Sequence, residues 1–125
     1  MKLSANRETI LQPLQAVIGV VERRQTMPIL ANVLLSARDG RLSVTATDLE
    51  VELLAGVEVT VQSAGDITVP GRKLLDICRA LPEEATLTFS VEGEKAIIRA
   101  ARSRFTLSSL PATEFPTVEE ISAQQ

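Results

Sequence analysis

Three residue types are missing from this chain of 125 residues: histidine, tryptophan and tyrosine. Without histidine there is no imidazole to act as an acid, a base or a metal ligand. The only aromatic residues are three phenylalanines. Stacking of single-stranded nucleic acid would have to rest on these three rings, and an interface anchored by tryptophan and tyrosine is excluded.

Cysteine and long apolar runs are also scarce. The single cysteine, Cys78, has no partner for an internal disulfide, so nothing points to an oxidising compartment. No apolar run reaches the roughly 18 residues of a membrane span, and the first residues lack the apolar core of a signal peptide. With 45% apolar and 23% charged residues, we expect one cytoplasmic globular domain without membrane contact.

Two segments have the apolar spacing of amphipathic helices. The first follows Asn6, a favourable N-cap residue, and carries apolar residues three and four positions apart over 10–21. Pro13 lies inside this pattern, and we expect it to kink the helix rather than end it. The second segment is predicted to have Pro70 in its first turn and an apolar stripe over 74–81.

The remaining segments alternate between apolar and polar residues and predict strands. The predicted strands are 1–5, 31–38, 41–47, 51–61, 67–69, 85–91, 95–101 and 104–110. Element order therefore reads β-α-β-β-β twice, over about 1–61 and 66–110, although the residues of the two halves match poorly. Each helix has one apolar stripe to bury, so we predict an α+β fold with both helices on one side of antiparallel sheets.

Candidate catalytic and metal-binding residues are few. Cys78 lies on the apolar stripe of the second helix with no histidine to activate it, which favours a core residue over a nucleophile. Asp48, Glu50 and Glu52 alternate along the chain; a hard-metal site is one interpretation, and a solvated strand face is the favoured one. Gly71 begins a Gly-Arg-Lys sequence without the spacing of a phosphate-binding loop. We expect neither catalysis nor a cofactor or metal.

Basic residues gather in three places although the net charge is −3. Arg23 and Arg24 follow the first helix. Arg72, Lys73 and Arg79 lie on the second helix, and the last cluster is Lys95, Arg99, Arg102 and Arg104, with no acid among them. Each cluster is either a solvated surface or a site for phosphate contacts that read no bases; composition alone leaves both open.

Five motifs resemble, in order, those of the bacterial DNA polymerase III beta sliding clamp family. They are MPILANVLL at 27–35, TATDLEVE at 45–52, VPGRKLLDICR at 69–79, RSRFTL at 102–107 and LPATEFP at 110–116. The resemblance implies a subunit of three similar domains, of which this chain resembles the N-terminal one. Two such subunits form a head-to-tail ring around duplex DNA, with the helices lining the hole and the sheets forming the rim.

The resemblance also implies roles for individual residues. The positions that match DNA contacts of the family are Arg24 and Arg72, with Lys73 beside it. Arg79 is added to them, because helical spacing puts it on the same exposed face as Arg72. The positions expected at the boundary with domain three of the second subunit are Lys95, Arg102, Arg104, Phe105 and Leu107. Two residues depart from the family pattern: Gly71 replaces a usual alanine, which weakens the start of the helix, and Gln25 stands where proline is common.

The implied function is non-catalytic: a ring that tethers the replicative polymerase for processive synthesis. DNA polymerase III and the clamp loader are expected to bind through domains that this chain lacks. The alternative is a stand-alone interaction module that self-associates through its last strand. The two hypotheses differ in oligomeric state, because we expect a clamp domain without its partner domain to be a monomer. Among the phenylalanines, Phe89 is predicted to be core, Phe115 to anchor the exit segment, and Phe105 to be functional.

Overall fold

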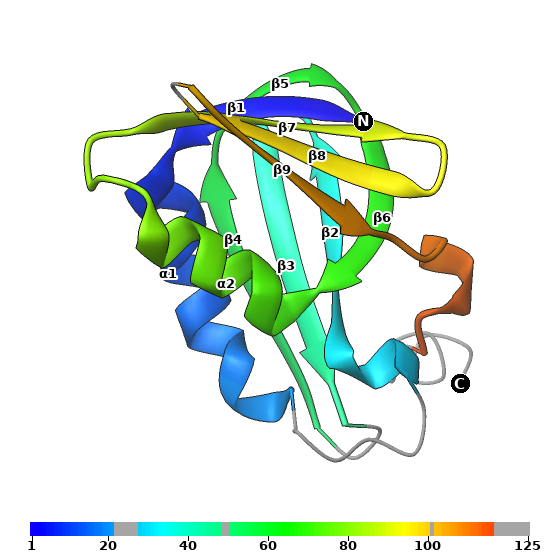
Figure 1. Ribbon diagram of the computed structural model, residues 1–125. Coiled ribbons are helices and arrows are strands. Elements are labelled where there is room, and N and C mark those ends of the chain that lie inside the picture. Colours follow the sequence, from blue (N-terminus) through cyan, green and yellow to red (C-terminus); the bar gives the residue numbers. More distant parts are fainter. Residues whose placement is uncertain (22–27, 49–50, 101, 117–125) are drawn as a thin grey trace.

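The computed structural model describes residues 1–21, 28–48, 51–100 and 102–116, and within them nine strands form two antiparallel sheets (Figure 1). The five-stranded sheet has the order β5-β1-β7-β8-β9, with β5 Thr60–Ser63, β1 Lys2–Asn6, β7 Thr86–Glu92, β8 Lys95–Ala100 and β9 Ser103–Ser108. The four-stranded sheet has the order β4-β3-β2-β6, with β4 Glu52–Glu58, β3 Arg41–Thr47, β2 Asn32–Arg38 and β6 Gly65–Pro70.

The two halves of the chain exchange their first strands. In the first half, β1 joins the five-stranded sheet while β2, β3 and β4 form a meander in the four-stranded sheet. In the second half, β6 joins the four-stranded sheet while β7, β8 and β9 form the meander of the other. β4 and β9 are therefore corresponding strands, each ending its meander at one edge of a sheet.

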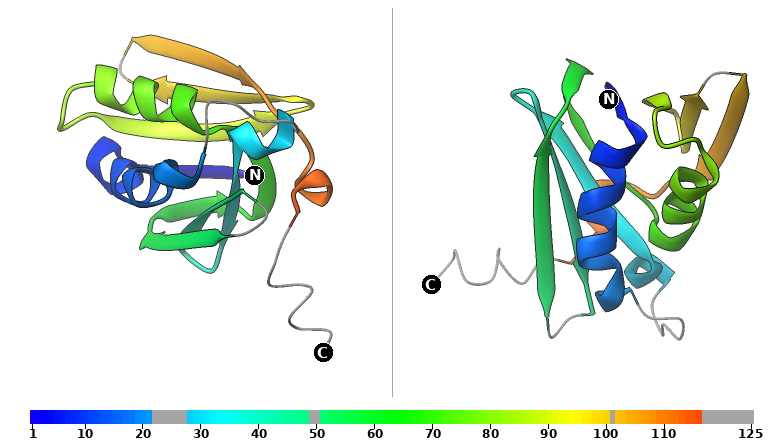
Figure 2. Two further views of the ribbon diagram at one scale, coloured as in Figure 1. Left: turned by 90° about the horizontal axis from the view of Figure 1, so that it is seen from below. Right: turned by 90° about the vertical axis from the view of Figure 1, so that its left-hand side faces the viewer.

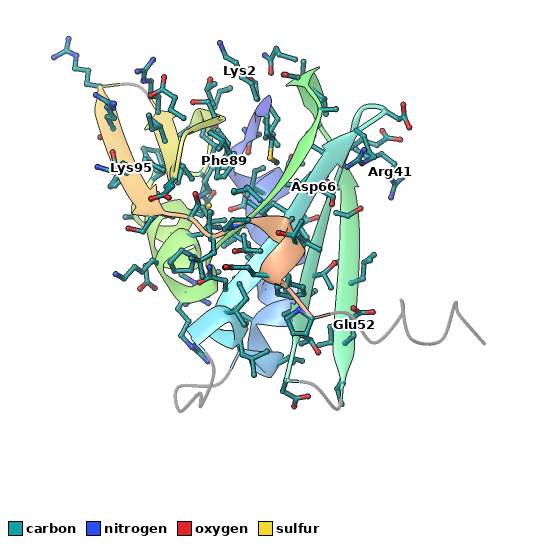
Figure 3. The ribbon with its side chains drawn as sticks, turned by 90° about the vertical axis from the view of Figure 1, so that its right-hand side faces the viewer. Lys2, Arg41, Glu52, Asp66, Phe89 and Lys95 are labelled. Atoms are coloured by element: carbon teal, nitrogen blue, oxygen red, sulfur yellow. The ribbon has the colours of Figure 1, made fainter. Side chains whose placement is uncertain are left out.

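Two helices, α1 Arg7–Val17 and α2 Gly71–Ala80, pack against each other on the same side of the sheets (Figure 2). This confirms the predicted α+β architecture. Their buried stripes join the inward faces of both sheets in one core, whose largest fully buried side chains include Leu3, Leu14, Leu42, Leu74, Leu87 and Ile98. Phe89 is buried there as predicted (Figure 3). No helix in the described ranges is long and apolar enough to cross a membrane.

Both helix starts have identifiable causes. The side chain of Asn6 accepts a hydrogen bond of 2.9 Å from the main-chain N–H of Glu8, which confirms Asn6 as the N-cap. α1 then runs through the buried Pro13 without ending. Pro70 was expected in the first turn of the second helix, and this placement is wrong. It ends β6 in an extended conformation (ψ 117°), and α2 begins at Gly71.

The prediction of one long strand over 51–61 is also wrong. The chain leaves the four-stranded sheet after β4 and enters the five-stranded sheet as β5, and between them the N–H of Val59 donates to the carbonyl of Gly40 at 2.9 Å. Val57, Val59 and Val61 all pack against the same core. The alternation therefore continues across the crossover. Gly56 lies within β4 and pairs in regular register with Ser43.

The segment after β9 is fixed to the four-stranded sheet. Thr68 and Leu110 exchange main-chain hydrogen bonds of 3.0 and 3.1 Å, and the hydroxyl of Thr68 also donates to the Leu110 carbonyl at 2.8 Å. The side-chain amide of Asn32 donates to that hydroxyl at 3.0 Å. Further along, Phe115 is buried against Ile29 and Leu30, which confirms its predicted role as an anchor.

Gly71 gives a first testable prediction. A Cβ atom there would lie 2.9 Å from Cγ1 of Val33, which is fully buried, and 3.2 Å from Cδ1 of Ile18. Alanine would favour the helix by up to about 1 kcal/mol, but overpacking costs about 1–3 kcal/mol. We expect Gly71→Ala to lower the midpoint of urea unfolding, whereas the control Gly19→Ala, with no atom within 4 Å, should not. If both variants unfolded at the same urea concentration, and that concentration were above the wild-type midpoint, this packing role of Gly71 would be contradicted.

Candidate nucleic-acid and subunit interfaces

The exposed sides of the two helices form one surface with an excess of positive charge. On α2 the exposed charged residues are three cations and one acid: Arg72, Lys73, Arg79 and Asp76. On α1 the exposed residues are uncharged: Gln12, Gln15 and Ala16. Because α1 and α2 pack side by side, the structure gives a positive helix surface on a chain whose net charge is −3.

Arg72 has a second role that the sequence did not reveal. Its Nη2 donates a hydrogen bond of 2.9 Å to the main-chain carbonyl of Val21, so it links the start of α2 to the end of the α1 region. Val21 lies two positions before Arg23 in the sequence. Arg24, predicted to contact DNA, lies outside the described residues, as does Gln25.

Lys73 and Arg79 are the less constrained cations of the helix surface. Both side chains are exposed, and within the described part of the chain neither forms a salt bridge. Arg79 lies in the last turn of α2, where the helix dipole favours a positive charge. Their charges are therefore available to an anion approaching the helices.

Arg7 shows that not every cation near the helices is available. Its Nε donates to the carbonyl of Leu81 at 3.2 Å, and its guanidinium pairs with Glu8. Nearby, burial raises the pKa of the Cys78 thiol to about 11, and the positive charge of Arg7 opposes this only in part. Cys78 is fully buried, which confirms the core interpretation and leaves the thiol protonated at neutral pH.

Of the three acids considered for a metal site, the structure describes Asp48 and Glu52. The carboxylate of Asp48 accepts a hydrogen bond of 2.8 Å from the N–H of Val51, the residue before β4. Glu52 begins β4, and Glu50 is not among the described residues. In the described ranges, no group of three or more candidate metal ligands occurs.

The predicted subunit-boundary residues lie along β9 and its neighbour. Within the described residues, β9 pairs only with β8, so its other edge carries no strand. Phe105 is half-buried and packs on the core, and Leu107 is buried beside it on the same side of the strand. Arg102, Arg104 and Lys95 are exposed, and Lys95 begins β8 at the outer margin of the molecule (Figure 3).

Arg99 belongs to the cluster of four cations, although the resemblance gives it no position of its own at the subunit boundary. The register of β8 and β9 places Arg99 directly opposite Arg104, and both side chains are exposed. Like charges facing each other across two strands are destabilising. An incoming carboxylate would relieve that repulsion. The pairing depends on strand register, which a run of charges in the sequence does not specify.

The architecture and these surfaces can be compared with known proteins. Residues 1–119 match the family described as DNA polymerase III beta subunit, N-terminal domain. The chain belongs to this family. The predicted resemblance is thereby confirmed across nearly the whole chain.

Named relatives agree with this assignment. The chain is 54% identical over 121 residues to the Beta sliding clamp of Pseudomonas putida, covering 96% of this chain and 33% of that protein. It is 50% identical over 123 residues to a Beta sliding clamp sequence from Vibrio harveyi, covering 96% and 83%. The chain therefore spans about one third of the Pseudomonas relative.

Solved structures of family members have the same fold. A sliding clamp from Pseudomonas aeruginosa aligns with a TM-score of 0.91 at 54% identity, covering 95% of this chain and 32% of that one. A DNA polymerase sliding clamp from Caulobacter crescentus aligns with a TM-score of 0.92 at 44% identity, covering 94% and 32%. The β-α-β-β-β order, read from alternation and helical spacing, thus belongs to the clamp architecture.

Proposed function

We propose that this chain is the first domain of a ring-shaped sliding clamp that encircles duplex DNA and tethers the replicative polymerase for processive synthesis. The observation that carries the proposal is the 54% identity to the Beta sliding clamp of Pseudomonas putida across 96% of this chain. In the proposed ring, two subunits join head to tail. DNA polymerase III and the clamp loader bind through further domains of the subunit, and the ring acts in the cytoplasm.

The helix surface supports non-specific contact with duplex DNA. We propose that Lys73, Arg79, Arg72 and Arg24 face the phosphates. Because these cations would contact phosphates and not base edges, the contact would be weak, independent of DNA sequence and sensitive to salt. The acidic charge of the whole chain limits tight non-specific binding. Such a surface lets a closed ring slide while the topology of the ring keeps it on DNA.

The β9 surface supports a subunit boundary. We propose that Phe105 and Leu107 meet apolar residues of domain three of the second subunit, while Lys95, Arg102 and Arg104 face acids there. The arrangement along β9 favours this, because Phe105 and Leu107 face the helix side, whereas Arg104 on β9 and Lys95 on β8 lie on the opposite face of the sheet. A strand edge with both kinds of residue can extend a sheet across a domain boundary.

We propose that the role is non-catalytic. The only thiol, Cys78, is buried and protonated. Two surface depressions of about 340 and 610 Å³ contain one carboxylate each, Glu58 and Glu92, and neither contains Cys78. The larger depression also contains Lys2 and Arg99, and neither depression contains the pair of carboxylates that many hydrolytic reactions use.

A chimera tests the proposed function with the chain in its assembled context. Residues 1–119 would replace the matching first domain of the Pseudomonas aeruginosa clamp, to which this chain is 54% identical. With the loader and polymerase of that organism, we expect primer-extension products as long as those made with the unmodified clamp. Products as short as those made without any clamp, from a chimera that is folded and dimeric, would contradict the proposal.

A further inference from the structure

The outer face of the five-stranded sheet carries a depression that the proposed function does not use. The sheet lies across the top of Figure 1 with both helices below it, so its outer face points away from the helix surface. The depression has a volume of about 610 Å³ and is lined by residues of β5, β1, β7 and β8. It involves neither helix and no residue of β9.

Two cations and two hydroxyl side chains share this outer face. Phe89 on β7 is buried toward the helices, so Thr88 and Ser90 on either side of it point to the outer face. Lys2 on β1 lies opposite Ser90, and Arg99 on β8 lies opposite Thr88. Both cations therefore reach the same face, and Figure 3 shows Lys2 directed away from the helices.

Neither cation has an acid partner within the described part of the chain. Lys2 and Arg99 are exposed, and the salt bridges of these residues do not include them. On β9, Arg99 faces a second cation, Arg104. The one acid in the lining, Glu92, lies opposite Lys95 at the end of the β7–β8 pair. The depression is therefore positive, although the net charge of the chain is −3.

The lining between the two cations can both donate and accept hydrogen bonds. Ser4, Thr88 and Ser90 contribute hydroxyl groups from β1 and β7. The side-chain amide of Gln62 on β5 donates to Oγ of Ser4 at 3.0 Å. Because a hydroxyl group is both a donor and an acceptor, this lining can pair with the N–H and C=O groups of an extended peptide.

The positions of the two cations set the spacing of the acids that could meet them. Only β7 separates β1 from β8, and Lys2 and Arg99 differ in register by two residues of β7. With strands about 4.8 Å apart and a rise of about 3.4 Å per residue, their Cα atoms are roughly 12 Å apart. Two acids three or four positions apart in an extended peptide span about the same distance.

We propose that this depression binds an extended acidic peptide of a partner protein, with one carboxylate at Lys2 and a second at Arg99. Charge complementarity carries the assignment, and the hydroxyl groups supply hydrogen bonds to the peptide main chain. Single-stranded nucleic acid fits less well, because no phenylalanine offers a base a ring on this face. Phe89 and Phe105 pack on the helix-side core, and Phe115 is buried in a separate cluster. The proposal goes beyond the proposed function, which assigns no ligand to this face.

Titration of the isotope-labelled chain with synthetic peptides, followed by the amide signals in NMR spectra, tests the proposal. The probe is a ten-residue peptide of glycine and serine with two glutamates four positions apart. We expect saturable shifts centred on Lys2, Thr88, Ser90 and Arg99, with a dissociation constant of about 1 mM because exposed ion pairs are weak. The same peptide with two glutamines should cause no shifts, and one with adjacent glutamates should bind more weakly.

Single substitutions show whether the two cations are responsible. Lys2→Gln and Arg99→Gln should each raise the dissociation constant of the probe about two- to fivefold. Arg41→Gln is the matched control, because it removes one positive charge from an exposed position on β3 in the other sheet. This control should bind the probe as wild type does, and circular dichroism checks that every variant is folded.

Four results would each overturn the proposal. They are shifts that lie on the helix surface or do not saturate, equal binding of all three peptides, an Arg41→Gln variant that binds as weakly as the other two, and tighter binding of a short oligothymidine to the same residues. None of these would remove the proposed clamp function, since the chimera experiment does not depend on a ligand at this face. A failed chimera, in turn, leaves the peptide titration intact.

Discussion

Replacing Phe105 by arginine in the chimera is expected to convert the ring dimer into single subunits. Phe105 is half-buried on the helix side of β9 and already packs on the core of its own domain. A partner strand would bury the rest of the ring, and an arginine there would place an unpaired charge in an apolar boundary, at a cost of several kcal/mol. Light scattering coupled to size-exclusion chromatography measures the mass directly.

Phe105→Leu is the matched control for this substitution. It keeps an apolar side chain of similar reach, so we expect the dimer to persist. Because Phe105 also contacts the domain core, circular dichroism of the isolated 125-residue chain with Phe105→Arg should show that it still folds. A Phe105→Arg chimera that remains a dimer at low micromolar concentration would show that this residue is not at the boundary.

Removing the charges of Lys73 and Arg79 together is expected to weaken duplex binding by the chimera and to flatten its salt dependence. Each phosphate contact contributes about 0.9 to the slope of log K against log salt concentration, so the pair should lower the slope by roughly 1.8 per subunit. Glutamine at both positions keeps the helical propensity close to that of the original residues. Fluorescence anisotropy with a labelled duplex at several salt concentrations gives the slope.

The control removes two positive charges from the outward sheet faces instead. Lys2→Gln with Arg41→Gln changes the net charge equally, at exposed positions on β1 and β3. We expect the slope of this variant to match that of the unchanged chimera. If the control lowers the slope as much as the helix pair does, the helix surface has no special part in DNA contact.

The elements of the fold could largely be predicted from sequence because their signals are local. Apolar spacing located both helices, and Asn6 marked the start of the first. The change of sheet at Val59 could not be predicted in this way. Both sheets pack on one core, so Val57 and Val61 keep the same alternation on either side of the crossover. A strand that changes its neighbours, while its buried face stays the same, leaves no mark in the pattern.

Some candidate functional residues could likewise be predicted from the sequence, and others could not. Lys73 and Arg79 were identified because their charge and their helical spacing can be read directly from the sequence. The structure places both on the exposed helix surface. The hydrogen bond from Arg72 to the Val21 carbonyl was missed, since its acceptor is a main-chain atom that every residue possesses. The facing pair of Arg99 and Arg104 was missed because it depends on the register between β8 and β9.

The most direct test of a ring that encircles DNA is retention on circular and linear duplexes. The chimera would be loaded onto a nicked circular plasmid, separated from free protein by gel filtration, and analysed again after the plasmid is cut once. We expect the chimera to stay with the circle and to be lost from the linear DNA, because a sliding ring leaves through a free end. Equal retention on both forms would show that the protein grips DNA rather than encircling it.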